Sequence, residues 1–507
     1  MLILSPDQIK QWDQYTIEHE PIASIDLMER AVLKCLNWLE IAGYCQQPFV
    51  IYCGKGNNGG DGLALARMLS LTQLSVKVFI LEFDYKGSVN FQENLTRLQQ
   101  TPVEISFIQN EDSLQPLPAS AIVIDALFGS GLNRQLDAVP TRLIEHINKS
   151  GNEVIAIDLP SGMFAHASSK GGAVIEASHT LSFQCYKLAF LLPENEANFG
   201  EIHILDIGLH PVFLQSVQTE MTLIDESFIS AIYKPRKAFS HKGTFGHALV
   251  VAGSFGKMGA AVLAAKACLR TGVGLLTCII PACGYNIMQS SVPEAMAITD
   301  IGDRYITNLE VDLFKYDVIG IGPGLGTAAQ TSESMSRLLS SMKSAMVLDA
   351  DALNILAAKK ELLNNLSPFS VITPHPKEFE RLFGASNNDV ERLHLAISKA
   401  KELQVIIVLK GHHSFIAMPG GKGYFNSTGN AGMATGGSGD VLTGIITGLV
   451  AQGYTSQEAS LLGVYLHGMA GDFAADLGSE EALIASDIVA CLGDAFKKIQ
   501  SFKPAAG

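Results

Sequence analysis

Short segments that are almost continuously apolar constrain the fold of this chain more than any other feature. In the first half they occupy residues 49–53, 76–81, 121–125 and 154–158, and amphipathic stretches of helical period separate them. Strands that are apolar on both faces are typical of a parallel sheet covered by helices on each side. We therefore predict an α/β fold whose ligands bind outside the carboxyl ends of the strands.

The same alternation starts again near residue 245, which indicates a second α/β domain. At 507 residues the chain also exceeds one ordinary core. Residues 1–225 carry 13 basic against 26 acidic side chains, whereas residues 226–507 carry 23 against 24. We predict a domain boundary at this change in charge, with a chance fluctuation as the alternative. The expected strands of the second domain lie at 248–253, 273–280, 317–321, 345–349, 369–373 and 405–409, and its last helices at 441–452, 456–475 and 486–499.

Composition excludes several classes of protein. The net charge of −14 argues against a nucleic-acid or anionic-membrane partner. No apolar run reaches about 18 residues, and the N-terminus lacks a charged segment before a long apolar one, so we expect neither a membrane span nor a signal peptide. The eight cysteines form no Cys-x-x-Cys pair and no zinc-like cluster, which indicates free thiols. We expect a cytoplasmic protein.

A glycine-rich loop follows the first apolar segment and leads into a predicted helix at residues 60–71. Its sequence, at residues 54–62, is Gly-Lys-Gly-Asn-Asn-Gly-Gly-Asp-Gly. Clustered glycine costs backbone entropy and rarely serves packing alone, whereas the start of a helix attracts phosphate. A tight strand-to-helix turn is the alternative, and the spacing departs from the dinucleotide-binding Gly-x-Gly-x-x-Gly pattern.

Carboxylates end two later apolar segments of the first domain. Asp125 precedes another glycine-rich segment, and Asp158 precedes Leu-Pro-Ser161-Gly. Strand ends meet at one edge of a parallel sheet, so these groups could transfer protons, or together with Asn58 could hold an oxygen-preferring cation. Each carboxylate alone is more often a helix cap or a loop anchor.

A second glycine-rich loop, at residues 430–440, also precedes an apolar helix. Its sequence is Asn-Ala-Gly-Met-Ala-Thr-Gly-Gly-Ser-Gly-Asp. Amides at a helix start can hold a phosphoryl group, and Asp440 beside them can take a proton from a substrate hydroxyl. The alternative is a buried helix whose dipole Asp440 complements.

Two further strand ends carry polar groups. Lys410, followed by Gly-His-His-Ser, either holds a nucleotide or is a solvated cation. His375 lies between two prolines, and Pro376 suits the first position of a helix. The positive end of that helix should keep His375 neutral, whether its role is catalytic or structural.

Four segments of the first half occur in the order found in one enzyme family. They are Gly-Asn57-Asn58-Gly-Gly-Asp61-Gly, Asp125 with Phe128-Gly-Ser-Gly-Leu, Ile-Asp158-Leu-Pro-Ser161-Gly, and Thr180-Leu-Ser-Phe with Lys187. Residues 1–225 thereby resemble the NAD(P)H-hydrate epimerase domain. The resemblance implies a Rossmann-like fold that interconverts the R and S hydrates of NADH and NADPH (NADHX and NADPHX). It implies potassium (K⁺) ligands at Asn58, Asp125 and Ser161. It implies substrate contacts at Asn57, Asn58, Gly59, Gly60, Asp61, Gly129, Ser130, Gly131, Leu132, Asn133, Arg134, Gln135 and Asp158.

Six motifs of the second half are also in family order. They are His241-Lys-Gly, Ala252-Gly-Ser, Gly322-Pro-Gly-Leu-Gly326, Asp349-Ala-Asp-Ala-Leu, Thr373-Pro-His375-Pro-Lys-Glu and the loop Asn430 to Asp440. Residues 226–507 thereby resemble the ribokinase-like superfamily and, more narrowly, the ADP/ATP-dependent NAD(P)H-hydrate dehydratases. This implies hydrate contacts at Gly326, His375, Pro376, Lys377, Glu378, Phe379, Glu380, Arg381 and Asp440. It implies ADP contacts at Lys410, Gly411, His412, His413, Ser414, Asn430, Ala431, Gly432, Met433, Ala434, Thr435, Gly436, Gly437, Ser438 and Gly439.

Together the resemblances imply a bifunctional repair enzyme. Asp440 would act as base while ADP phosphorylates the hydrate, and loss of phosphate would restore the cofactor and leave AMP. Asp158, which ends a strand beside a glycine turn, is our expected acid/base group of the epimerase. We also expect Mg²⁺ at the dehydratase site and a homo-oligomer. The alternatives are a ribokinase-like small-molecule kinase with an accessory N-terminal nucleotide-binding domain, and a nucleotide-binding sensor without turnover.

Overall fold

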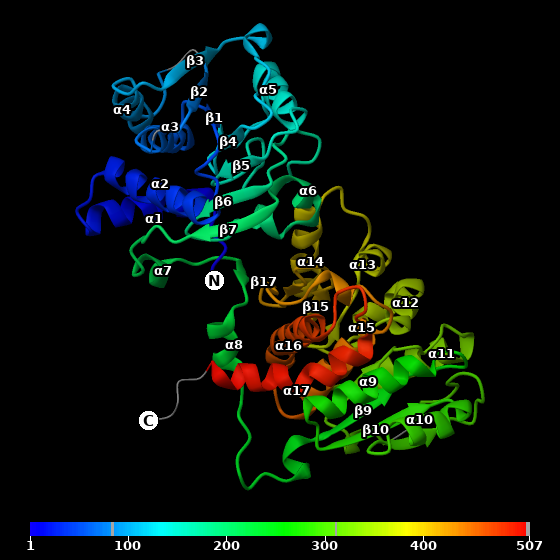
Figure 1. Cartoon of the computed structure of the whole chain (residues 1–507). Coiled ribbons are helices and arrows are strands. Elements are labelled where there is room, and N and C mark those ends of the chain that lie inside the picture. The colour runs from blue at the N-terminus through cyan, green and yellow to red at the C-terminus, as the bar shows by residue number, and fades with distance from the viewer. Residues whose placement is uncertain (73, 83–85, 310–311, 503–507) are drawn as a thin grey trace. The chain divides into compact units, whose positions relative to one another are not determined.

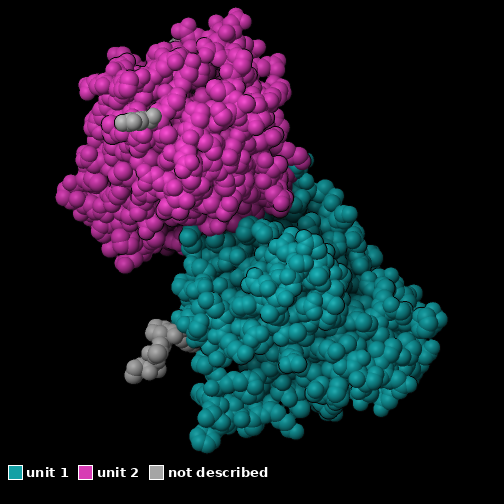
Figure 2. Space-filling view, in the orientation of Figure 1, with its two compact units in different colours: residues 1, 220–387, 391–507 teal, residues 2–219, 388–390 magenta. Residues whose placement is uncertain are grey.

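The computed structural model describes residues 1–72, 74–82, 86–309 and 312–502, which form two compact units (Figures 1 and 2). The N-terminal unit, magenta in Figure 2, comprises residues 2–219 with 388–390. The C-terminal unit, in teal, comprises Met1, residues 220–387 and residues 391–507. Both units are α/β, as predicted. The domain boundary at residue 225 stays a prediction, because these units are defined by packing alone.

The N-terminal unit is built on a seven-stranded sheet of order β3-β2-β1-β4-β5-β6-β7, in which every neighbouring pair is parallel. Its strands are β1 (Phe49–Cys53), β2 (Val76–Leu81), β3 (Glu104–Ile108), β4 (Ile122–Ala126), β5 (Val154–Ile157), β6 (His179–Phe183) and β7 (Glu201–Leu205). Its helices are α1 (Pro6–His19), α2 (Ser24–Ile41), α3 (Asn57–Ser70), α4 (Val89–Leu98), α5 (Ala138–Asn148), α6 (Glu196–Phe199) and α7 (Phe213–Ser216).

The predicted apolar segments form the four neighbouring strands β2, β1, β4 and β5. Successive residues of a strand face opposite sides. Ile51 and Ile124 therefore pack in one core, and Tyr52 and Val123 in the other. Strands β3, β6 and β7 were not predicted, and β3 and β7 lie at the sheet edges with mostly half-buried or exposed residues, which weakens an apolar pattern.

The C-terminal unit contains a ten-stranded sheet of order β11-β10-β9-β12-β13-β14-β15-β16-β17-β8. It is parallel except where β16 pairs with β15 and β17. Its strands are β8 (Met221–Leu223), β9 (His247–Val251), β10 (Leu275–Ile280), β11 (Met296–Thr299), β12 (Val318–Ile321), β13 (Met346–Leu348), β14 (Val371–Ile372), β15 (Ile406–Leu409), β16 (Phe415–Ala417) and β17 (Gly423–Phe425). Its helices are α8 (Glu226–Ile232), α9 (Met258–Thr271), α10 (Tyr285–Ser291), α11 (Ala329–Ser341), α12 (Asp351–Ala358), α13 (Pro376–Phe383), α14 (Asp389–Leu403, whose first two residues are assigned to the N-terminal unit), α15 (Ser438–Ala451), α16 (Ser456–Leu477) and α17 (Ala485–Ser501).

All six strands expected in this unit are present, together with four that were not expected. The additional strands, β8, β11, β16 and β17, have three or four residues each, too few to show a period. The apolar helices α9, α15, α16 and α17 share one core with the central strands. None of the described helices is both long and apolar enough to cross a membrane.

Local sequence sets where helices begin. Ser5 caps α1, since its Oγ accepts a hydrogen bond of 3.2 Å from the Gln8 amide. Helix α2, in contrast, has Ala23 at its cap position and therefore no side-chain cap. The hydroxyl of Ser24, the first residue of α2, accepts a hydrogen bond of 2.9 Å from Nδ2 of the Asn90 side chain.

Candidate active sites

The first candidate site lies at the carboxyl edge of the N-terminal sheet. Asp125 is the penultimate residue of β4, and Asp158 directly follows β5. Helix α3 follows β1, the neighbour of β4, and begins at Asn57 rather than at the expected Gly60. The amide-rich segment of the first glycine loop is therefore the first turn of this helix.

Three glycines of this loop are required by packing. A Cβ atom on Gly59 would lie 1.7 Å from the Gly54 carbonyl oxygen, and one on Gly54 would lie 2.0 Å from that of Leu127. A Cβ on Gly62 would lie 2.6 Å from the Ala126 Cβ. The expectation that such glycines rarely serve packing is wrong at these positions, because the loop folds closely onto itself and onto β4.

Asp125 and Ser161 form a buried polar pair. Ser161 donates its hydroxyl to Asp125 Oδ1 (2.6 Å) and its amide to Oδ2 (2.7 Å). Burial raises the pKa of Asp125 to about 6, although the hydrogen bonds from Ser161 oppose the shift. Among the described residues, neither amide atom of the buried Asn58 side chain has a hydrogen-bond partner. Carboxylate, hydroxyl and unsatisfied amide oxygens are ligands that a hard cation prefers.

Asp158 is paired with a buried lysine. Lys187 Nζ lies 2.8 Å from Asp158 Oδ1, and its side chain is 1% exposed. The backbone of Asp158 is left-handed (φ 67°), which aspartate tolerates better than most residues, and Oδ2 accepts the Ser130 amide at 3.0 Å. Burial alone would raise the pKa of Asp158, but Lys187 and Ser130 hold it below its usual value. Asp158 is thus an ionised carboxylate at neutral pH.

Two other carboxyl groups share this site, and their pKa values are raised rather than lowered. Burial, with Asp158 as the next contribution, raises the pKa of Asp61 well above its usual value. The same two causes raise the pKa of Asp13 to about 7, with Lys187 opposing. The site therefore combines an ionised carboxylate with carboxyl groups that retain a proton.

Sequence reasoning missed Asp13 and gave Lys187 no role. Asp13 lies on α1, more than a hundred residues before β4, and no motif surrounds it. Of the predicted segment 129–135, Ser130 donates its amide to Asp158, and Gly129 lies beside the same carboxylate. A Cβ there would be 3.2 Å from both Asn58 Cβ and Asp158 Oδ2.

The second candidate site lies at the carboxyl edge of the C-terminal sheet. Asp349 directly follows β13 and is 1% exposed. Its two oxygens accept hydrogen bonds of 2.8 Å from Lys410 Nζ and from the Thr443 hydroxyl. The alternative reading of Lys410 as a solvated cation is therefore wrong. Ala350, with φ 50°, turns the chain sharply between Asp349 and Asp351.

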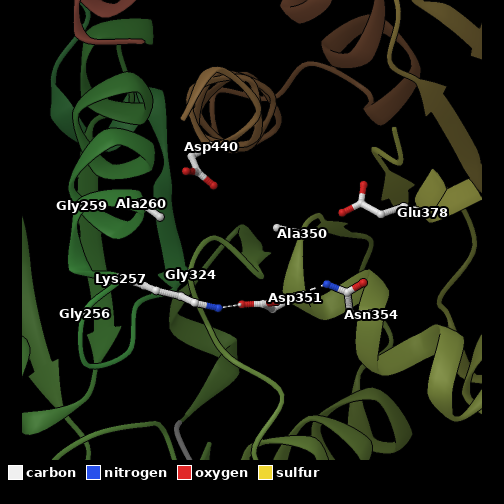
Figure 3. A pocket seen from close by; sticks show the side chains of 10 residues that line it. All are labelled: Gly256, Lys257, Gly259, Ala260, Gly324, Ala350, Asp351, Asn354, Glu378 and Asp440. Carbon is white, nitrogen blue, oxygen red and sulfur yellow. Dashed lines mark hydrogen bonds and ion pairs between the residues drawn. The ribbon is translucent and has the colours of Figure 1, made fainter. Parts of the chain in front are cut away.

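Asp440 projects into a cavity of about 470 Å³ from the first turn of α15 (Figure 3). Burial raises its pKa to about 6, Asp349 adds to the shift, and Lys410 opposes it. Asp351 lies across the cavity and accepts hydrogen bonds from Lys257 (3.2 Å) and from the Gly326 amide (2.8 Å). The cavity is lined by Gly256, Lys257, Gly259, Ala260, Gly324, Ala350, Asp351, Asn354, Glu378 and Asp440.

His375 caps α13, and Pro376 is the first residue of that helix, as expected. Nδ1 of His375 accepts the amides of Lys377 (3.1 Å) and Glu378 (3.4 Å). Burial lowers the pKa of His375, which agrees with the predicted neutral form. Phe379 is 1% exposed and packs against Phe383, so its side chain belongs to the core.

Side chains from α16 anchor the second glycine loop. Asp472 accepts hydrogen bonds from Asn430 Nδ2 (2.9 Å) and from the Gly429 amide (3.0 Å). His467 contacts the Ser438 hydroxyl at 3.2 Å, and burial lowers its pKa to about 4. The adjacent turn is held by His413, whose Nδ1 bonds the Asn426 carbonyl at 3.0 Å. Asp472 and His467, which no sequence motif indicated, hold the loop at the start of α15.

Two family models match the chain. One, described as YjeF-related protein N-terminus, matches residues 24–189. The other, described as NAD(P)H-hydrate dehydratase, matches residues 248–490. Together they fall on the two halves that carry the two sites.

Relatives match nearly the whole chain. The bifunctional NAD(P)H-hydrate repair enzyme of Moorella thermoacetica is 37% identical over 508 residues, which is 96% of this chain and 95% of that protein. The protein of the same name from Escherichia coli is 30% identical and covers 96% of this chain and 92% of its own length. The solved ADP/ATP-dependent NAD(P)H-hydrate dehydratase of Bacillus subtilis is 32% identical over 55% of this chain and 98% of its own, with a TM-score of 0.49. The chain belongs to the family of bifunctional NAD(P)H-hydrate repair enzymes.

Proposed function

We propose that the N-terminal unit epimerises the R and S hydrates of NADH and NADPH, and that the C-terminal unit dehydrates the S hydrate with ADP. One observation carries the proposal besides family membership. In each unit a lysine-paired aspartate, Asp158 or Asp349, adjoins a carboxyl group of raised pKa. A carboxylate that stays ionised beside a carboxyl group that titrates near neutral pH is suited to proton transfer.

In the dehydratase, Asp440 accepts the proton of the C6 hydroxyl of the hydrate. The hydroxyl oxygen attacks the β-phosphorus of ADP at the same time. AMP departs, and the resulting phosphate ester is a better leaving group than hydroxide. Loss of phosphate from C6 and of a proton from C5 then restores the double bond. The amides at the start of α15 and the Lys410 ammonium stabilise the transferring phosphoryl group.

In the epimerase, the configuration at C6 inverts when the C–O bond breaks and re-forms on the opposite face. Asp13, which keeps a proton up to pH about 7, donates it to the departing oxygen, which leaves as water. Asp158 accepts a proton from the water molecule that adds to the other face. Asn57, Asp61 and the segment 129–135 surround the hydrate.

Both units can hold a cation. Asn58, Asp125 and Ser161 would hold K⁺, since the unsatisfied amide of Asn58 fits an oxygen-seeking ion. K⁺ would supply a positive charge for the substrate phosphates. Asp351 and Glu378 would hold Mg²⁺ beside ADP in the cavity of the C-terminal unit. Replacing K⁺ by tetramethylammonium, or Asn58→Ala, should lower epimerase kcat/KM and leave dehydration of the S hydrate unchanged.

An absorbance assay at the reduced-nicotinamide band tests the proposal. Purified R and S hydrates are supplied with ADP, ATP or no nucleotide. The expected result is that Asp158→Asn processes only the S hydrate at speed, whereas Asp440→Asn restores no absorbance from either. A ribokinase-like kinase would instead accumulate a stable phosphorylated alcohol. Intact hydrates after incubation with both nucleotides and K⁺ would refute the proposed function.

A further inference from the structure

The N-terminal unit carries a cluster of metal-ligating side chains away from its candidate active site. His179 is the first residue of β6, Glu201 is the first residue of the edge strand β7, and His203 follows two residues later. His179 pairs with Glu201 in the strand register, and alternate residues of a strand share a face, so the three side chains lie on one face. The cluster is at the amino-terminal edge of the sheet, opposite the edge that carries Asp158.

The ligand atoms of these residues converge. Nδ1 of His179 lies 3.1 Å from Nε2 of His203 and 3.6 Å from Glu201 Oε2. Nε2 of His203 lies 3.9 Å from the same oxygen. Two nitrogens that each lie about 2.1 Å from a tetrahedral metal ion are about 3.4 Å apart. The three atoms therefore have nearly the spacing of one face of a tetrahedral coordination sphere.

Neighbouring groups orient the two imidazoles. Glu153 Oε1 lies 3.7 Å from Nε2 of His179, and the same carboxylate accepts the Tyr44 hydroxyl. Metal-binding histidines commonly face a carboxylate through their other nitrogen, which favours the required tautomer. Trp38 packs against both rings, with centroid separations of 5.2 Å to His179 and 4.6 Å to His203. The cluster is thus arranged before any ion binds.

We propose that His179, Glu201 and His203 bind one divalent transition-metal ion of the Zn²⁺ class and that this ion clamps the edge strand β7 to β6. Imidazole nitrogens select Zn²⁺, Ni²⁺ or Cu²⁺ over Mg²⁺ and K⁺. The Glu201 side chain is 69% exposed, so the fourth coordination position faces solvent and takes water. The ion is structural and is separate from the proposed epimerase chemistry.

Calorimetric titration of the chelator-treated full chain with Zn²⁺ tests the site. We expect one tight site per chain, whose affinity falls at least about tenfold in His179→Gln and in His203→Gln. His146→Gln, which changes a half-buried histidine on α5, outside the cluster, is the matched control and should leave the affinity unchanged. The control is needed because the chain has 13 histidines. Zn²⁺ affinity that is undetectable, or that neither cluster substitution alters, would overturn the proposal.

Tryptophan fluorescence provides a readout that is local to the cluster. The chain has two tryptophans, so Trp12→Phe leaves Trp38 as the only reporter. Cu²⁺ should quench Trp38 in this background and fail to quench it when His203→Gln is added. If Trp12→Phe does not fold, the wild type is compared with Trp38→Phe instead, and the quenching by Cu²⁺ should be lost in Trp38→Phe.

Stability and activity separate this proposal from the proposed function. Zn²⁺ should raise the melting temperature of the wild type but not of His203→Gln, since a ligand stabilises only the state that binds it. Hydrate epimerisation should be equal in the two proteins. A Zn²⁺-induced shift that persists in His203→Gln would assign the ion to another place and contradict the clamp.

Discussion

At the scale of single residues, both candidate sites use the same electrostatic device. Lys187 and Lys410 each lie 2.8 Å from a buried aspartate oxygen. A buried carboxylate without a partner is strongly disfavoured, so the lysine keeps its aspartate charged. Burial, with the charged aspartate as the next cause, raises the pKa of a neighbouring carboxyl group, Asp13 or Asp440, which can then exchange a proton near neutrality.

Asp13 should set the alkaline limit of epimerisation. Its pKa of about 7 means that the proton to be donated is lost as the pH rises through 7, so epimerase kcat/KM should fall above that pH. Asp13→Asn should lower kcat/KM by at least about 100-fold and remove this dependence. The measurement is a pH–rate profile on the R hydrate, and a rate that stays level to pH 9 in the wild type would exclude Asp13 as the acid.

The stability of Asp13→Asn provides an independent check on the same group. Because the folded-state pKa of Asp13 is raised above 3.8, its protonated form favours folding, and this contribution is lost as the pH rises from about 4 to about 7. The wild type should therefore lose melting temperature relative to the variant across that window. Parallel curves would show that the pKa is not raised.

Lys410→Met should alter the pH dependence of dehydration. Lys410 lowers the pKa of Asp440, so its removal should raise that pKa and move the acid limb of kcat to higher pH. The variant should also be less stable, because Asp349 loses its ion pair. Lys399→Met, an exchange on α14 at a lysine paired with Glu402, is the control and should leave the profile in place. If the acid limb of the kcat profile does not shift in Lys410→Met, Lys410 does not control the pKa of Asp440.

At the scale of elements, the sequence predicted the position of the first glycine loop correctly but not the reason for its glycines. The loop does precede a helix at the carboxyl edge of the sheet. Its glycines, however, are required where backbone meets backbone, at Gly54 and Gly59. A sequence shows clustered glycine but not the distance to Leu127, because that distance depends on how β1 and β4 pair.

Gly59→Ala should destabilise the N-terminal unit, and Gly56→Ala provides a matched control in the same loop. The added methyl of Gly59→Ala would overlap the Gly54 carbonyl, and overpacking of this kind costs about 1–3 kcal/mol. Nothing lies within 4 Å of a Cβ on Gly56, so Gly56→Ala should cost less than about 1 kcal/mol. Chemical denaturation measures both, and equal losses would contradict the packing argument.

At the scale of the whole molecule, one chain carries two candidate sites, one in each unit, and each lies at the carboxyl edge of that unit's sheet. The predicted fold class is confirmed as α/β in both units, and the predicted family is confirmed as well. Site roles for individual residues stay proposals, and they assign one reaction to each unit.

Mixing two variants that each lack one of the two activities should therefore restore repair of the R hydrate. Asp158→Asn cannot make the S hydrate quickly, and Asp440→Asn cannot dehydrate it, but the S hydrate can diffuse from one protein to the other. The mixture should convert the R hydrate faster than either variant alone, measured as recovered reduced-nicotinamide absorbance. A mixture no faster than Asp158→Asn by itself would indicate that the two activities do not divide between the units as proposed.

The sequence by itself determined the layered α/β architecture, because strands that are apolar on both faces can be buried only between helices. It also determined that Asp125, Asp158 and Asp440 would stand beside glycine turns, since these neighbours are adjacent in the chain. Only the tertiary structure decided that Asp13 and Lys187 meet Asp158, and that Lys410 meets Asp349. Those pairings join residues far apart in sequence, and the pKa shifts that define their chemistry come from burial and neighbouring charge, which exist only once the chain has folded.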